Sequence, residues 1–129
     1  MLADFYAYLS ADTALATLLG GEGRIYPDVA PEGATAPYLV YGIASDGGAE
    51  EVLGELSIRV SVYADSALKA EAIVERVKRL LDVQDAIAIP SAIYRIRWCK
   101  QLAGSGMYEP DTRLYNRALV FSFKFTEVI

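Results

Sequence analysis

Apolar residues recur every three or four positions near the start of the chain, the spacing that lines one face of an α-helix. The segment runs from residue 2 to residue 19 and ends at Gly20-Gly21, a pair typical of helix termini. A polar break at residues 10–12 interrupts the pattern. The segment therefore predicts a helix in one or two pieces, with Ser10 or Asp12 as the cap of the second piece.

A second helical pattern follows Asp65-Ser66, a pair with the carboxylate and hydroxyl groups that cap helix N-termini. Its apolar stripe extends to Leu81, and charged residues occupy the opposite face. This segment predicts an amphipathic helix that packs its apolar stripe against the rest of the protein.

Four other segments are rich in β-branched and aromatic residues and predict strands. Glycine-rich sequence joins them in pairs, Asp46-Gly47-Gly48 in the first pair and Gly104-Ser105-Gly106 in the second, so each pair predicts a hairpin. The predicted strands are residues 37–45, 52–64, 93–102 and 113–127.

Side chains alternate in character along two of these strands, with apolar residues on one face and mostly polar residues on the other. Such alternation is typical of a sheet with one covered face, and we expect helices to form the cover. The apolar residues of that face are Leu56, Ile58, Val60, Val62, Leu119, Phe121, Phe123 and Phe125.

The order helix, hairpin, helix, hairpin predicts an α+β fold in a single domain, residues 1–129. We expect a mixed or antiparallel sheet of about four strands, with two helices packed on one face. Between the first helix and the first hairpin, three prolines restrict the backbone. That segment is expected to run extended over the surface, held by Ile25 and Tyr26.

Composition narrows the possible functions. The 129 residues include no histidine and one cysteine, which excludes histidine-based triads, histidine-ligated metals and intrachain disulfides. The net charge of −5 disfavours nucleic acid as a partner, because affinity for phosphates requires positive charge. The start of the chain has no basic stretch and no segment is apolar over a membrane-spanning length. We therefore expect no signal peptide, no membrane partner and synthesis in a reducing cytoplasm.

Two kinds of residue are candidates for catalysis or metal binding. Carboxylates gather at the two predicted turns, but they lack the spacing of a calcium loop, so we interpret them as solvated. Cys99 has no histidine to activate it and is interpreted as a structural thiol. We expect no enzyme activity, no cofactor and no bound metal. The carboxylates are Asp46, Glu50, Glu51, Glu55, Glu109 and Asp111.

Charge is divided unevenly along the chain. Residues 1–55 carry nine acids and one base, a net −8, whereas residues 56–129 carry eight acids and eleven bases, a net +3. Either these charges interleave within one folded chain, or an acidic edge of one subunit meets basic residues of the next. Tyrosines near the second hairpin suit an interface or the edge of the core. The candidate subunit-interface residues are Arg95, Arg97, Arg113, Arg117, Tyr108, Tyr115, Glu50 and Glu51.

Several short segments in the first two thirds of the chain resemble one known protein family. They are Arg24-Ile25-Tyr26-Pro27, Ala30-Pro31-Glu32-Gly33, Pro37-Tyr38-Leu39-Val40-Tyr41 and Val60-Ser61-Val62-Tyr63-Ala64, followed by the predicted helix over residues 70–81. In this order they resemble the tail-completion, or tail-terminator, proteins of long-tailed bacteriophages and prophages. The resemblance covers residues 2–82, and that family has no catalytic motif to compare.

The resemblance implies a small α+β subunit of the virion tail that assembles into a ring, usually hexameric, on top of the tail tube. Such a ring stops tube polymerisation and provides the surface for joining the head. The implied partners are further copies of the chain, the tail-tube protein and a head-completion or connector protein. Two other functions stay open on the sequence alone: a neighbouring head–tail connector or minor tail component, and a small-molecule-binding α+β module.

Overall fold

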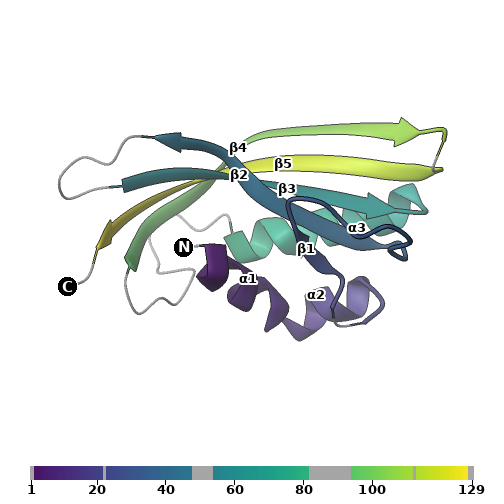
Figure 1. Cartoon of the computed structure of the whole chain (residues 1–129), viewed down its shortest axis with the longest axis horizontal. Coiled ribbons are helices and arrows are strands. Elements are labelled where there is room, and N and C mark those ends of the chain that lie inside the picture. The colour runs from purple at the N-terminus through teal and green to yellow at the C-terminus, as the bar shows by residue number, and fades with distance from the viewer. Residues whose placement is uncertain (1, 22, 48–53, 82–93, 112, 128–129) are drawn as a thin grey trace.

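Three helices and five strands make up the part of the chain that the structure, a computed structural model, describes (Figure 1). The described residues are 2–21, 23–47, 54–81, 94–111 and 113–127. The helices are α1 (Leu2–Ser10), α2 (Thr13–Leu18) and α3 (Ala67–Leu81). The strands are β1 (Ile25–Pro27), β2 (Tyr38–Gly47), β3 (Gly54–Ala64), β4 (Tyr94–Glu109) and β5 (Leu114–Glu127).

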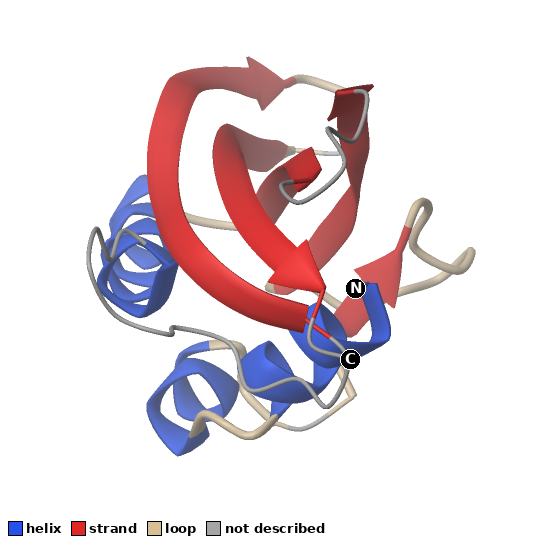
Figure 2. Ribbon diagram, turned by 90° about the vertical axis from the view of Figure 1, so that its left-hand side faces the viewer, coloured by secondary structure: helices blue, strands red, loops and turns tan. Residues whose placement is uncertain are grey.

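The five strands form one mixed sheet in the order β1-β2-β3-β5-β4. The short strand β1 pairs with β2 in parallel, and all the other neighbours are antiparallel. Figure 2 shows that the sheet curves strongly and that the three helices lie along one side of it. The expected α+β class, mixed sheet and one-sided helical cover are therefore confirmed.

The sheet has five strands where about four were expected. The additional strand is β1, in the segment predicted only to run extended over the surface. Ile25 lies opposite Leu39, and the backbone N–H of Leu39 donates to the carbonyl of Arg24 at 2.9 Å. A three-residue strand that ends in proline is too short to show alternation, so the sequence pattern did not indicate this pairing.

Three helices cover the sheet rather than two, because the polar break at residues 10–12 separates α1 from α2. The carboxylate of Asp12 accepts a hydrogen bond from the backbone N–H of Leu15 at 2.8 Å and so caps α2. The helix predicted after Asp65-Ser66 is present as α3, and the hydroxyl of Ser66 accepts from the N–H of Lys69 at 3.2 Å. Both predicted capping sites are therefore used.

The predicted break of the second hairpin at residues 104–106 is wrong, because β4 continues through these residues to Glu109. Gly104 pairs with Leu119 and Gly106 pairs with Arg117. A Cβ atom on Gly106 would lie only 2.8 Å from Cδ of Arg117, so the glycine makes room for a side chain of the adjacent strand. These glycines therefore serve cross-strand packing and do not form a turn.

The hydrophobic core lies between the helices and the covered face of the sheet. All the predicted residues of that face whose side chains are described are buried, and the Phe125 side chain lies outside that set. Phe5 of α1 contacts the ring of Phe123 edge-on, with the centroids 5.8 Å apart. The helical residues that complete this core are Phe5, Leu9, Leu15, Ile73, Val74, Val77 and Leu81.

Candidate assembly surfaces

Strand β4 contains three of the candidate interface residues, Arg95, Arg97 and Tyr108, and only the side chain of Tyr108 lies in the described part of the chain. Arg95 pairs with Thr126 in the sheet, and Arg97 lies at a register shift of β4. Their side chains, together with residues Glu50 and Glu51, lie outside the described part. The expectation that Arg95 and Arg97 form a patch on one strand face therefore stays a prediction.

The far half of the β4–β5 hairpin, residues 104–117, forms an arm that reaches one end of the molecule (Figure 1). Tyr108 and Tyr115 are brought together there, with ring centroids 4.8 Å apart. Met107 and Tyr108 are 59% and 48% exposed. Arg113 is exposed at the tip, where its backbone N–H donates to the carbonyl of Glu109 at 2.8 Å. The arm thus presents apolar and basic side chains to solvent together.

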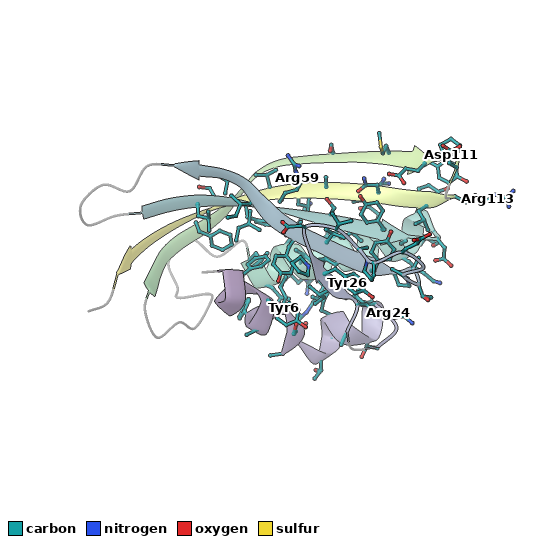
Figure 3. All side chains as sticks on the ribbon, viewed as in Figure 1. Tyr6, Arg24, Tyr26, Arg59, Asp111 and Arg113 are labelled. Carbon is teal, nitrogen blue, oxygen red and sulfur yellow. The ribbon has the colours of Figure 1, made fainter. Side chains whose placement is uncertain are left out.

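Arg117, the fourth arginine of the candidate set, has a partner within the chain. Its Nε donates to Oε1 of Glu71 on α3 at 2.9 Å. A second intrachain pair joins Asp12 of the acidic N-terminal half to Arg76 of the basic half. The Asp12–Arg76 pair joins the two halves, so there the uneven charge of the sequence is balanced within one subunit, whereas Arg117 and Glu71 both belong to the basic half. Among the described candidates, Arg113 is the basic residue that points away from the body of the molecule (Figure 3).

The Asp12–Arg76 pair ties the cap of α2 to the middle of α3. Arg76 Nε donates to Oδ2 of Asp12 at 2.9 Å and Nη2 donates to Oδ1 at 2.6 Å, a bidentate arrangement. These hydrogen bonds from Arg76, together with the N–H of Leu15, hold the pKa of Asp12 below its usual value despite partial burial. The pair was not predicted from sequence, because 64 positions separate its members.

The face of the sheet turned away from the helices carries tyrosines from three strands. The rings of Tyr38 and Tyr63 stack with centroids 5.0 Å apart, and Tyr26 meets Tyr38 edge-on at 6.1 Å. Burial raises the pKa of Tyr38, with smaller contributions from Tyr63 and from the nearby carboxylate of Glu109. Burial, and then the charge of Glu109, also raises the pKa of Tyr63. The phenols of Tyr38 and Tyr63 therefore stay neutral at physiological pH.

A groove lies beside these tyrosines on the open face. Its larger part, of about 430 Å³, is adjoined by a second hollow of about 270 Å³ that shares Asp28, Val40 and Tyr63 and extends to Arg59. Two carboxylates line the larger part, Asp28 from the loop after β1 and Glu109 from the end of β4. Its full lining is Asp28, Val29, Ala30, Tyr38, Val40, Tyr63 and Glu109.

Sequence reasoning missed this groove for a physical reason. Its lining comes from the loop after β1, from β2 and β3, and from the end of β4, so it exists only once the sheet has paired and curved. The one signal in the sequence is the abundance of tyrosine, nine residues in 129. In the sequence, Tyr26 is expected to hold the extended segment, and all three tyrosines Tyr26, Tyr38 and Tyr63 belong to the segments of the family resemblance, but no pattern indicates that their rings meet.

Among the described residues, no three acidic or cysteine side chains come close enough together to hold a metal ion. No described helix has the length and apolar character needed to cross a membrane. Asp111, one of the carboxylates that the sequence places at a predicted turn, is exposed at the tip of the arm.

The geometry defines a small α+β protein whose notable features are the exposed tip of the β4–β5 arm and an open, grooved sheet face. Comparison with protein families gives a specific assignment: the family described as "Tail completion protein gp17" matches residues 3–126. The chain therefore belongs to this family, in agreement with the resemblance seen in its first two thirds. No match is found among curated protein sequences.

Two solved structures have a similar fold. One is a chain from a structure titled "Virion of native gene transfer agent (GTA) particle", with a TM-score of 0.75 and 22% identity. The alignment covers 99% of this chain and 95% of that one. A second chain aligns with a TM-score of 0.58 and 14% identity, over 99% of this chain and 93% of that one. At these identities the similarity establishes the fold.

Proposed function

We propose that this protein completes the tail of a phage or phage-like particle by forming a ring on the end of the tail tube. The observation that carries the proposal is the family match, which spans residues 3–126 and so includes the core, the open face and the arm. The structural similarity to a chain of a gene transfer agent virion supports a location in the virion. We infer a hexameric ring, as is usual in the family that the sequence resembles.

The proposed mechanism is association without bond-making. A ring that ends polymerisation must bind the terminal face of the tube more tightly than another ring of tube subunits does. Its opposite face must offer no surface on which tube subunits add, and must instead accept the head-completion or connector protein. The exposed arm and the open groove supply two unlike surfaces on one subunit, which head-to-tail contacts around a ring require.

Negative-stain electron microscopy of the purified protein, with and without its tail-tube protein, tests the proposal. We expect closed rings at the ends of tubes, and tubes that stop growing after the protein is added. Tubes that lengthen at an unchanged rate, or protein bound along tube walls, would contradict the proposed role. A preference for purified connector over tube ends would favour the neighbouring connector function instead.

A further inference from the structure

We propose that the groove on the open face receives Arg113 from the arm of a second copy of this chain. This inference rests on the proposed ring and names the contact that joins neighbouring subunits within it. Two features carry it: the chemistry of the groove, and the availability of Arg113 among the described arginines.

The groove is built to hold a planar cation. Its lining includes the stacked rings of Tyr38 and Tyr63 and the carboxylates of Asp28 and Glu109. A guanidinium group stacks on aromatic rings and pairs with carboxylates at the same time, which an anion or an apolar side chain does not do. Next to Tyr63 in the sheet, Asn116 has a buried side-chain oxygen with no hydrogen-bond partner among the described residues, an acceptor near the groove.

The described arginines leave one clear candidate to fill another subunit's groove. Arg59 lines the adjoining hollow of the same groove, and Arg79 is exposed on α3, on the helical side of the sheet. Arg113 lies at the tip of the arm and points away from its own subunit (Figure 3). The remaining described arginines donate hydrogen bonds within their own chain; these are Arg24, Arg76 and Arg117.

Asp28 and Arg113 share an uncommon backbone conformation. They are the two non-glycine residues at positive φ in the described chain, each with φ of 59°. Hydrogen bonds hold both turns, from the N–H of Asp28 to the carbonyl of Tyr41 at 2.7 Å and from the N–H of Arg113 to Glu109. The left-handed conformation is unfavourable for arginine and is only tolerated by aspartate. The fold therefore keeps this conformation, at a cost in free energy, at two positions of opposite charge.

The position of Asp28 also depends on a glycine. An added Cβ on Gly42 would lie 3.1 Å from Oδ1 of Asp28, so the absence of a side chain on β2 leaves room for the carboxylate beside the groove. Glu109 of the arm borders the groove and its carbonyl accepts the N–H of Arg113, but the Arg113 side chain points away from its own subunit (Figure 3) and so does not fill that subunit's groove. A subunit that gives its arm to one neighbour therefore keeps its groove for another, which is the head-to-tail contact that closes rings.

Cross-linking between two single-cysteine variants tests the contact directly. In a Cys99→Ser background, one variant carries Val29→Cys at the rim of the groove, where Val29 is 78% exposed, and the other carries Asp111→Cys near Arg113. A short bis-maleimide linker should join the two variants when they are mixed, several-fold more than it joins either variant to itself. Leu68→Cys on α3, 84% exposed, replaces Asp111→Cys in the control mixture. Equal yields in the two mixtures would overturn the proposal. This includes the case in which both yields are low because the protein stays monomeric.

A charge swap gives a second, independent measurement. Arg113→Glu should weaken self-association, measured by sedimentation, by about tenfold or more, because it places a third carboxylate in the groove. The combined variant Asp28→Arg with Arg113→Glu should restore association, since each contact regains opposite charges. Arg79→Glu is the matched control and should leave association unchanged. Equal effects of Arg113→Glu and Arg79→Glu, or no recovery in the combined variant, would overturn the contact.

Tube capping separates this inference from the proposed function. If Arg113→Glu caps tubes as the wild type does and the cross-link is absent, the contact is wrong and the capping role stands. If the cross-link forms and the wild type caps no tube, the capping role is wrong and the contact stands. If Arg113→Glu loses capping with self-association unchanged, the partner of Arg113 is the tube protein, which overturns the second copy as the occupant.

Discussion

The two faces of strand β3 show how differently one sheet is used on its two sides. Ile58 and Val60 point to the helices and are 0% exposed. Their sequence neighbours Arg59 and Ser61 point to the open face, where both line a hollow. The covered face is filled by side chains of its own chain, whereas the open face combines aromatic rings, carboxylates and a guanidinium group around a groove.

This difference separates stability from assembly. Burial of apolar side chains supplies most of the free energy of folding, so the covered face should dominate stability. Charged and half-buried groups on the open face contribute less to folding and are available to a partner. Substitutions on the two faces should therefore change different measurements, and the following predictions test that separation.

Phe121→Ala should have the largest effect on stability. Phe121 is 0% exposed on the covered face, and truncation of a buried phenylalanine costs about 3–5 kcal/mol through lost burial and the cavity left behind. Its neighbour Val120 faces the other side and is half-buried, so Val120→Ala should cost about 1 kcal/mol or less. Urea denaturation of both variants measures the difference. Similar losses at the two positions would remove the distinction between the faces.

Asp12→Ala should reduce the free energy of unfolding by about 2 kcal/mol at neutral pH. It removes the cap of α2 and one partner of the bidentate pair with Arg76, two contributions of about 1 kcal/mol each. Asp12→Asn keeps a capping oxygen and should lose only the ion pair, about half as much. Thermal or chemical denaturation of the two variants separates the contributions, and equal losses would show that the cap contributes little.

The pH dependence of Asp12→Asn follows from the lowered pKa of Asp12. Because the folded-state pKa lies below the unfolded value of about 3.9, the stabilisation is complete above that pH. It is lost as the pH falls through the folded-state pKa, where the carboxylate takes up a proton. Wild type and Asp12→Asn should therefore differ most at neutral pH and converge in acid. A difference that persists unchanged to about pH 2 would exclude the ion pair as its source.

Tyr63→Ala should cost about 1 kcal/mol, less than Phe121→Ala, because the ring is only half-buried on the open face. A double-mutant cycle with Tyr38→Ala should give a coupling energy of about 0.5–1.5 kcal/mol for the stacked pair. Both variants should also weaken self-association if the groove is a subunit contact. A stability loss as large as that of Phe121→Ala would mean that the open face belongs to the core.

The covered face was predictable because its signal is local. Alternation from Leu56 to Val62 and from Leu119 to Phe123 reports a buried face without knowledge of the pairing. The caps at Asp12 and Ser66 are likewise set by residues within one turn of their helices.

The open face was not predictable because its features depend on pairing between distant segments. The stack of Tyr38 on Tyr63 requires the register of β2 with β3, and the groove also requires the loop after β1 and the end of β4. Glycine gave a misleading signal in the arm, where Gly104 and Gly106 make room for side chains of β5. Of the candidate interface residues, the fold brings the rings of Tyr108 and Tyr115 together, and only the fold shows that Arg117 is paired with Glu71.

Gly106→Ala should have the smallest effect, a loss below about 1 kcal/mol, because two opposing contributions nearly cancel. Gly106 does not have positive φ, so alanine fits the backbone and stabilises by about 0.4–1 kcal/mol through the unfolded state. The new methyl group would, however, lie 2.6 Å from Nη1 and 2.8 Å from Cδ of Arg117. The side chain must move, and its ion pair with Glu71, half-exposed and worth about 1 kcal/mol at most, is lost.

The sign of this effect should reverse when Arg117 is absent. In an Arg117→Ala background the methyl group meets no guanidinium stem, so Gly106→Ala should stabilise the protein by a few tenths of a kcal/mol or more. Denaturation of the four proteins in this cycle measures the coupling. Glu71→Ala separates the two costs: the ion pair is already lost in that background, so any destabilisation by Gly106→Ala that remains comes from displacement of the arginine stem alone. If Gly106→Ala changed the free energy of unfolding in the same direction with and without the Arg117 side chain, accommodation of Arg117 would not explain the glycine at position 106.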